Sequence, residues 1–189
     1  NGKSFFENGV IKYDGNWKNN LHSEDGVLYS ETGIIVYSGN WSYGKKNGYG
    51  TQYHENGNIK YSGDFVEDKR EGDGTEFDKD GKITTKGVWK EDRVNGTVIQ
   101  YYADGTIEFT GFMKNNMFFG KGVYYFDNGI TYAGEFENSN FNGYGKKTRF
   151  VIHALNFLSE KTRQLFMKAI GETTSIMATA SGTTRVEVS

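Results

Sequence analysis

Cysteine and proline are both missing from the 189 residues of this chain. Without cysteine, the protein can have no disulfide bridge, thiolate zinc site or cysteine nucleophile, and the absence fits a reducing compartment. Neither sign of charge is in large excess, because 22 Lys and Arg stand against 24 Asp and Glu. This balance argues against a strongly basic nucleic-acid-binding protein. No apolar run approaches the roughly 18 residues that span a bilayer, and no secretory signal pattern opens the chain.

Glycine and aromatic residues are abundant but unevenly placed. All 13 Tyr and 24 of the 26 Gly fall in residues 1–150. Residues 151–189 contain one apolar stretch with helical spacing, followed by an end rich in Thr, Ser and Ala. The change in composition predicts two parts that meet near Phe150. The first residue is Asn rather than Met, which predicts a chain that is processed or is part of a longer protein.

The first part is organised as an internal repeat, in which an aromatic–x–Gly–x–aromatic triplet recurs every 23 or 24 residues. The complete copies are Tyr13-Gly15-Trp17, Tyr37-Gly39-Trp41, Tyr61-Gly63-Phe65 and Tyr132-Gly134-Phe136, and the weaker ones are Thr85-Gly87-Trp89 and Phe109-Gly111-Met113. A Gly-x-Gly pair follows most copies, at Gly48/Gly50, Gly72/Gly74, Gly120/Gly122 and Gly143/Gly145, with single glycines at Gly26 and Gly96. A fixed period of this length predicts a stacked repeat architecture.

Each copy has the pattern of a β-hairpin. Residues 59–65 alternate apolar and polar side chains with period two, as a half-exposed strand does. Residues 67–70 form a polar turn, and residues 72–77 form a returning strand. Asn-Gly and Asp-Gly pairs, the strongest short hairpin signal, separate successive copies. Two turns per copy predict an all-β fold of about twelve antiparallel strands with no helix before residue 150. Phe5 and Gly9 fit the second half of a preceding copy.

These motifs resemble the MORN (membrane occupation and recognition nexus) repeat family, whose copies read Y-x-G-x-W/F followed by G-x-G. The resemblance covers about residues 5–150 and implies an elongated, single-layer antiparallel sheet of about six stacked hairpins. Four departures stand out: Thr85 and Met113 replace aromatic residues, and Glu24 and Val98 replace glycines of the Gly-x-Gly pair. Thr148 also ends the last copy without its aromatic residue.

A single sheet without a second layer would leave its aromatic face partly exposed, and an exposed apolar surface of that size usually marks a partner site. We therefore expect a non-enzymatic scaffold that binds a peptide or helix of another protein on this face. Large aromatic side chains dominate binding energetics. The expected partner-binding residues are Tyr13, Trp17, Tyr37, Trp41, Tyr61, Phe65 and Trp89. The resemblance further implies a cytoplasmic subunit of a cytoskeletal, ciliary or membrane-associated complex.

Two alternatives remain open from the sequence. The first is a phosphoinositide-binding or membrane-binding module, as the family name implies. Its candidate lipid-binding residues lie at equivalent turns: Lys45, Lys46, Lys69, Arg70 and Arg93. Acidic residues occupy the same turns, however, and binding to anionic lipid favours basic clusters free of acids. The second alternative is a targeting region of a larger enzyme, because similar repeats precede lipid-kinase and methyltransferase domains.

The second part of the chain predicts a helix. Leu155, Leu158, Leu165 and Phe166 recur with helical spacing, which gives an amphipathic α-helix over residues 151–170. This helix is expected to cap the last hairpins, to dock on another subunit or, least favoured, to lie on a membrane surface. Residues 171–189 are poor in apolar side chains and are expected to be flexible or ordered by a partner.

No pattern of residues predicts catalysis. The three histidines are far apart in the repeat and match no metal-binding spacing. Carboxylates recur at the turns, where turn chemistry accounts for Asp and Asn. The glycine pairs precede no helix that could direct backbone dipoles at a phosphate. We therefore expect no catalytic residues, no metal site, no cofactor and no nucleic-acid partner.

Overall fold

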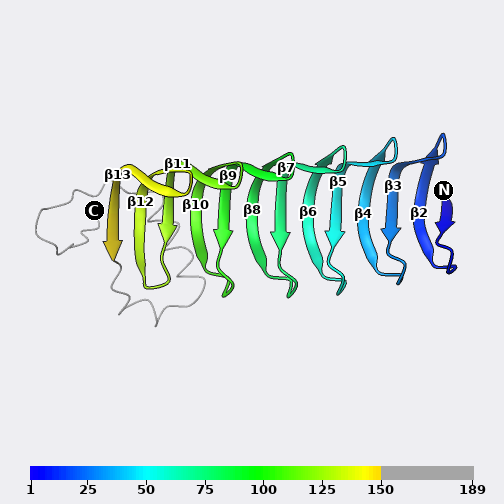
Figure 1. Cartoon of the computed structure of the whole chain (residues 1–189), viewed down its shortest axis with the longest axis horizontal. Helices are drawn as coiled ribbons and strands as arrows, with labels where there is room; N and C mark the ends of the chain where they lie inside the picture. Colours follow the sequence, from blue (N-terminus) through cyan, green and yellow to red (C-terminus); the bar gives the residue numbers. More distant parts are fainter. Residues whose placement is uncertain (150–189) are drawn as a thin grey trace, which may run out of the picture. The chain divides into compact units, whose positions relative to one another are not determined.

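The computed structural model describes residues 1–149, which form one antiparallel sheet of thirteen strands in chain order (Figure 1). The strands are β1 (Gly2–Phe5), β2 (Ile11–Lys18), β3 (Leu21–Tyr29), β4 (Ile35–Ser42), β5 (Lys45–Tyr53), β6 (Ile59–Val66), β7 (Lys69–Phe77), β8 (Ile83–Lys90), β9 (Arg93–Tyr101), β10 (Ile107–Lys114), β11 (Met117–Tyr125), β12 (Ile130–Glu137) and β13 (Asn140–Arg149). The predicted all-β hairpin array is confirmed, and the part of the chain described contains no helix. The strand beyond the expected twelve is β1, from the half copy near Phe5.

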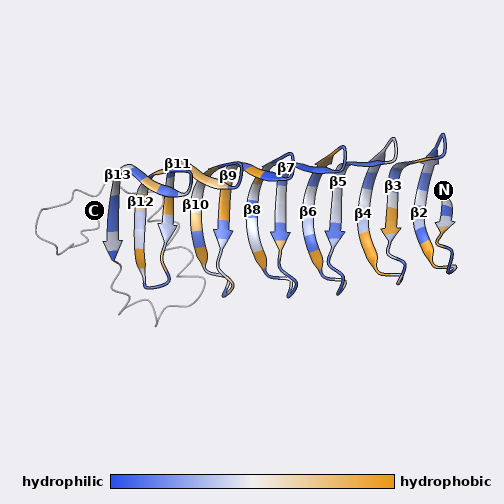
Figure 2. Ribbon diagram, viewed as in Figure 1, coloured by the Kyte–Doolittle hydropathy of each residue, from blue (hydrophilic) through white to orange (hydrophobic). Residues whose placement is uncertain are grey.

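The chain divides into two units, Asn1–Phe150 and Val151–Ser189. The predicted helix over residues 151–170 and the tail over 171–189 lie outside the described residues. Within the array, hydrophobic residues form short bands on the strands rather than continuous runs (Figure 2). This distribution fits a sheet in which side chains alternate between two faces.

Two kinds of turn alternate along the array. Within each hairpin, a two-residue turn has positive φ at both positions, as in Glu67 (49°) and Asp68 (71°). This is the turn geometry that matches the twist of paired strands. Between hairpins, loops of four or five residues each contain a glycine in the left-handed region, such as Gly57 with φ 85°. The Asn-Gly and Asp-Gly pairs that separate successive copies therefore lie in the loops that join the hairpins.

The two glycines of each Gly-x-Gly pair have different tasks. The first lies at an irregularity in strand pairing and adopts positive φ, as Gly72 does at 63°. The second pairs with the triplet glycine of the preceding strand, as Gly74 does with Gly63. The ring of Tyr61 lies directly against Gly74, so that a Cβ at this position would overlap the phenol. Only glycine lets an aromatic ring approach the backbone this closely.

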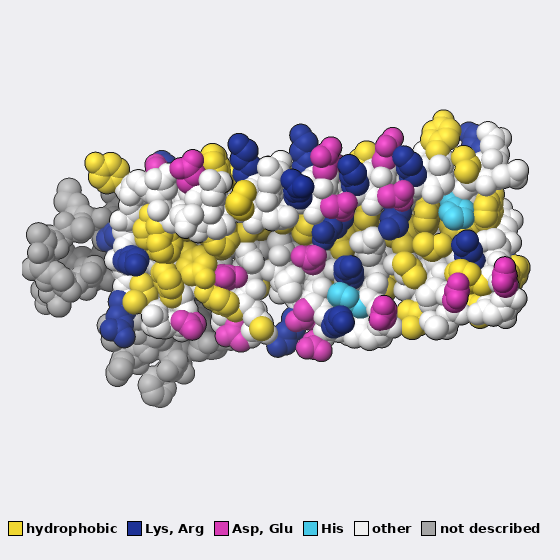
Figure 3. All heavy atoms as spheres, in the orientation of Figure 1, with side chains coloured by type: hydrophobic (Ala, Val, Ile, Leu, Met, Phe, Trp, Pro, Cys, Tyr) yellow, Lys and Arg dark blue, Asp and Glu magenta, His cyan; other side chains and the backbone are white. Residues whose placement is uncertain are grey.

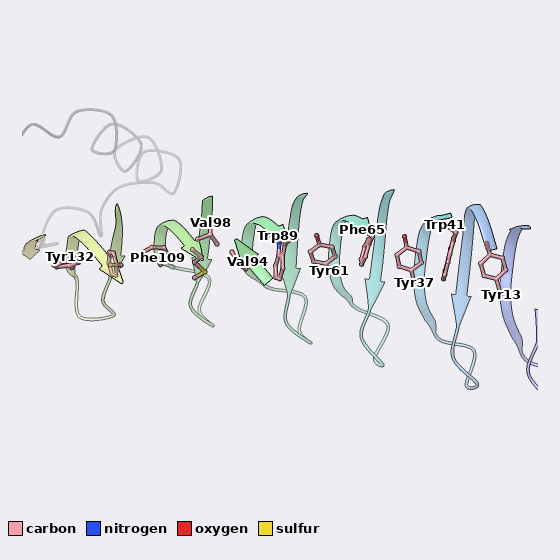
Figure 4. Packing of buried hydrophobic residues seen from close by; sticks show 12 residues of the cluster. Tyr13, Tyr37, Trp41, Tyr61, Phe65, Trp89, Val94, Val98, Phe109 and Tyr132 are labelled. Atoms are coloured by element: carbon pink, nitrogen blue, oxygen red, sulfur yellow. The ribbon is translucent and has the colours of Figure 1, made fainter. Parts of the chain in front are cut away.

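The hairpins curve at their two-residue-turn ends (Figure 1). Side chains from these ends lie over the buried rings, as His22 does over Tyr13 and Phe118 over Phe109. Tyr13 shows the result: one side of its ring contacts Gly26, and His22 stacks on it at a centroid distance of 3.7 Å. The turn end of each hairpin therefore supplies a second layer that the flat sheet lacks. Figure 4 shows the buried side chains in single file along the array. They are Tyr13, Tyr37, Trp41, Tyr61, Phe65, Trp89, Val94, Val98, Phe109, Met113, Tyr132 and Phe136.

The repeat that departs from the pattern compensates for its own changes. Thr85 stands where the other copies have a ring, and Val98 stands where they have the second glycine. With no ring at Thr85, the space over the backbone is free for a side chain. Val98 fills it and is only 4% exposed. The two departures therefore preserve the packing of the core.

Neighbouring hairpins are joined by a repeated pair of hydrogen bonds at the two-residue turns. Asn116 N donates to Val94 O at 2.9 Å, and Val94 N donates to Asn116 Oδ1 at 2.6 Å. Asp92 makes the same pair of bonds with Arg70. These contacts hold each folded-over end against the next, which is how a repeat array gains stability from its neighbours.

We expect Asn116→Gly to lower the free energy of unfolding by about 1–2 kcal/mol, because the buried Val94 N–H loses its acceptor. Glycine tolerates the φ of 66° at this position, and Gly44 occupies the equivalent turn. Urea unfolding followed by tryptophan fluorescence measures the change. The matched control is Asn115→Gly, whose side chain makes no hydrogen bond within residues 1–149. Equal losses for the two variants would show that the inter-hairpin bond is not the cause.

Candidate functional site

The residues that cover the buried rings form a row along the aromatic face, which we define as the face carrying the aromatic triplets. Each pairs with the last residue of a triplet, five positions before it in the chain. We call this row the capping row: His22, Lys46, Arg70, Val94, Phe118 and Phe141. Its first three members carry nitrogen groups and its last three are apolar. The chemistry of the face therefore changes along the array.

In the first half, cationic or polar groups lie over the rings. The imidazole of His22 stacks on Tyr13 and meets Trp41 edge-on at 4.9 Å, and burial lowers the pKa of His22. The ammonium of Lys46 lies 5.3 Å from the ring centroid of Tyr37. Cations over aromatic faces are attracted by the ring quadrupole. In this half of the array, the buried rings therefore contact polar side chains of the capping row.

Arg70 is the most highly connected member of the capping row. Its guanidinium lies 4.0 Å from the ring centroid of Trp89, and its Nη1 pairs with Glu76 at 2.8 Å. Its Nε also pairs with Asp92 at 3.4 Å. The charge of Arg70 is thus neutralised within the array.

In the second half, aromatic side chains gather on the surface. Phe118 stacks on Phe109 at 4.0 Å, and Phe141 lies 4.2 Å from Tyr132. We call the surface group Phe118, Tyr124, Phe126 and Phe141 the aromatic patch. Figure 3 shows a band of hydrophobic side chains that is broadest over the β10–β13 end.

The patch is exposed and carries a cation at its border. Phe141 is 47% exposed, whereas Phe118, Tyr124 and Phe126 are half-buried. The ammonium of Lys147 lies 5.5 Å from the ring of Phe141 and 5.8 Å from that of Phe126. Exposed aromatic clusters with a polar border are typical of protein-binding sites.

Most of the partner-binding residues expected from the sequence lie in the core. Tyr13, Tyr37, Trp41, Tyr61, Phe65 and Trp89 are all at most 6% exposed. Trp17 is 37% exposed and donates its Nε1 hydrogen to Gly2 O at 3.0 Å. A buried ring offers a partner no surface, so in this structure the first six stabilise the array itself. The expectation of an open aromatic layer was wrong about these six because the hairpin ends fold over them.

The candidate lipid-binding residues divide between the two faces of the sheet. Lys46 and Arg70 belong to the capping row, whereas Lys45, Lys69 and Arg93 each precede a capping-row position and point the other way. Lys45 also pairs with Glu67 at 3.3 Å. The five residues therefore do not form one basic cluster.

Sequence reasoning missed the capping row and the aromatic patch. The row has constant spacing, but its members range from histidine and arginine to valine and phenylalanine. A pattern that looks for one residue type does not detect such a position. The one available signal was the fixed offset from each triplet, which becomes meaningful only once strand pairing is known.

Three buried tyrosines of the aromatic face have hydrogen-bonded hydroxyl groups and raised pKa values. Tyr13, Tyr37 and Tyr61 each donate their hydroxyl hydrogen to a backbone oxygen three residues ahead. Burial raises the pKa of Tyr13 to about 12, with smaller contributions from Asp25 and Asp14. Burial likewise raises the pKa of Tyr37 and of Tyr61. Their phenols stay neutral at physiological pH.

Within residues 1–149, no group of three or more His, Cys, Asp or Glu is placed to hold a metal ion. No helix within the same residues has the length and hydropathy to cross a bilayer.

Comparison with known families matches most of the array. The MORN repeat model matches residues 13–33, 37–59, 61–83, 109–131 and 132–149, and the MORN repeat variant model matches residues 1–19 and 94–115. Residues 84–93, which include Thr85, match neither. Comparison with curated proteins finds no similar sequence. The five copies of the first model cover more than half of the chain, and they match in the same register as the hairpins. The chain therefore belongs to the MORN repeat family.

Proposed function

We propose that this array is a non-enzymatic scaffold that binds a peptide or helix of another protein along the capping row, with the aromatic patch as its main contact. MORN repeats generally serve in protein or membrane interaction. The observation that carries the proposal is the exposed aromatic patch, in particular Phe141 and Phe126 beside Lys147. We further propose, from the family resemblance, a role in a cytoskeletal, ciliary or membrane-associated complex.

The chemistry of the patch suits a protein segment. Aromatic side chains that are partly packed against a rigid core lose little conformational freedom on binding, and they dominate interface energetics. Phe118 and Phe141 are each held in place by a buried ring beneath them. The patch is therefore preorganised, which lowers the cost of association.

The test begins with peptides selected on the full chain from a displayed library of random segments about 16 residues long, enough to extend over about 50 Å. Affinities are then measured by fluorescence anisotropy for the wild type and for Phe126→Ser/Phe141→Ser. We expect the double variant to bind at least about tenfold more weakly, because truncating a contact of this kind costs over 1 kcal/mol.

Phe112 and Phe119 provide a matched control, because they pair on the opposite face and are 41% and 37% exposed. We expect Phe112→Ser/Phe119→Ser to change the affinity less than about twofold, since surface changes away from the site are usually small. Thermal melting of each variant separates loss of contact from loss of fold. Equal losses for the two double variants, or no selected peptide at all, would overturn the proposal.

A further inference from the structure

Lys46 differs from its equivalent one repeat later in having no ionic partner. Arg70 pairs with Glu76 and with Asp92. At the position of Glu76, the repeat of Lys46 has Gln52, which is neutral. Asp68 occupies the position of Asp92, and the Oδ1 atom of each accepts the backbone N–H of the capping-row residue at 2.9 Å. Only Asp92 also lies within ion-pair distance of the capping-row side chain. Among residues 1–149, no carboxylate lies within ion-pair distance of the Lys46 ammonium.

This ammonium is nevertheless held in a fixed place on the aromatic face. It lies 5.3 Å from the ring centroid of Tyr37 and 5.8 Å from that of Phe65. The side chain is half-buried, and burial lowers the pKa of Lys46 although Asp68 and Asp92 act in the opposite direction. A partly desolvated charge without a partner is costly, and an added counter-charge removes that cost.

We propose that Lys46 receives the carboxylate of an Asp or Glu side chain from the bound protein segment, so that the partner is acidic at the β4–β6 end and apolar at the β10–β13 end. This inference rests on the proposed function and adds the chemistry of its ligand. In the free array, neutral Gln52 stands at the position from which Glu76 pairs with Arg70, so Lys46 lacks this carboxylate. The partner supplies the missing carboxylate.

The surroundings favour a carboxylate over a phosphate group. The turns beside Lys46 carry Glu67, Asp68, Glu91 and Asp92. Their negative charges oppose a doubly charged phosphate more strongly than a singly charged carboxylate. Lys45 is already paired with Glu67 and points to the other face, so it does not add to the charge at this position.

The geometry also sets a spacing in the ligand. Lys46 lies on β5 and Phe118 on β11, six strand positions apart. At about 4.8 Å per strand this is roughly 29 Å, which an extended peptide spans in about nine residues. A carboxylate about nine residues from an aromatic or aliphatic residue is therefore expected in an extended ligand.

The experiment uses the peptides selected on the full chain. We expect these peptides to be enriched in Asp or Glu. Replacing the acidic residue by Asn or Gln should weaken binding by about fivefold or more, because a charge-assisted hydrogen bond is lost. Lys46→Met should weaken binding of the acidic peptide by the same factor and leave the affinity for the Asn or Gln peptide unchanged. The effects of the two changes are then not additive. Lys90→Met, which removes an exposed lysine elsewhere on the array, is the matched control and should leave both affinities unchanged.

A second variant tests the same contact without removing the lysine. Gln52→Glu installs the carboxylate that the next repeat has at Glu76. We expect Glu at position 52 to pair with Lys46 and to weaken binding of the acidic peptide by a similar factor. Thermal stability should not decrease. Methionine at position 46 keeps the apolar contact with Tyr37, and melting curves confirm that the fold is retained.

The outcomes separate this inference from the proposed function. Peptides that depend on Phe126 and Phe141 but show no coupling to Lys46 would overturn the inference and leave the proposed function standing. Failure to select any peptide would overturn both. A further measurement tests binding to phosphatidylcholine vesicles that contain phosphatidylinositol 4,5-bisphosphate. If Lys46→Met abolishes such binding, Lys46 binds a lipid headgroup, and the proposal that it binds a carboxylate is overturned.

Discussion

Gly74→Val is expected to lower the free energy of unfolding by about 3 kcal/mol, the upper range for forced overpacking of a core. A Cβ at this position overlaps the ring of Tyr61, which is fully buried and cannot move aside. Urea unfolding followed by tryptophan fluorescence measures the loss. Thr75→Val, one residue further along β7 and on the opposite face, is the matched control and should change stability by less than about 0.5 kcal/mol.

The repeat that contains Thr85 and Val98 shows which second substitution should compensate for Gly74→Val. Tyr61→Thr alone should cost about 3 kcal/mol or more, because it leaves a cavity over the glycine. The double variant Tyr61→Thr/Gly74→Val reproduces the arrangement of Thr85 and Val98, in which valine fills the space of the ring. We expect it to recover about 2 kcal/mol of the summed losses, a coupling typical of residues in contact. Additive losses would contradict this account of the glycine.

The array is expected to unfold cooperatively in alkaline solution, through the ionisation of Tyr13, Tyr37 and Tyr61. Burial raises the pKa of each, to about 12 for Tyr13. A phenol in the unfolded chain has a pKa of about 10. The folded state holds the proton more tightly, so this stabilisation is fully present below about pH 10 and is lost as the pH rises through the folded value.

Circular dichroism and absorbance at 295 nm, recorded together between about pH 9 and pH 12.5, measure unfolding and phenolate formation. The range follows from these pKa values. Phenylalanine at all three positions should move the transition to higher pH, after correction for three lost hydrogen bonds of about 1 kcal/mol each at neutral pH. Tyr144→Phe, at a side chain that is 96% exposed, is the control and should leave the transition unchanged. Ionisation of all tyrosines at a pH below the loss of strand signal would show that the core does not protect these phenols.

The amino-acid sequence alone determined the architecture of this protein. Repeats of an aromatic triplet with a Gly-x-Gly pair fixed the hairpin, its period and the meander order, because strand alternation and turn chemistry are local properties. The half copy near Phe5 corresponds to β1, the strand beyond the predicted twelve.

Only the tertiary structure decided which residues lie in the core and which lie on the surface of the aromatic face. The positive φ at Gly72 and the irregular pairing beside it bend each hairpin, and the bend brings residues such as Lys46 and Phe118 over the rings. Bending of a sheet depends on how neighbouring hairpins pack and bond, which no local pattern specifies. The aromatic residues of the triplets therefore form the core. The exposed chemistry of the aromatic face comes from the capping row, whose members differ in residue type and lie five positions after the triplets.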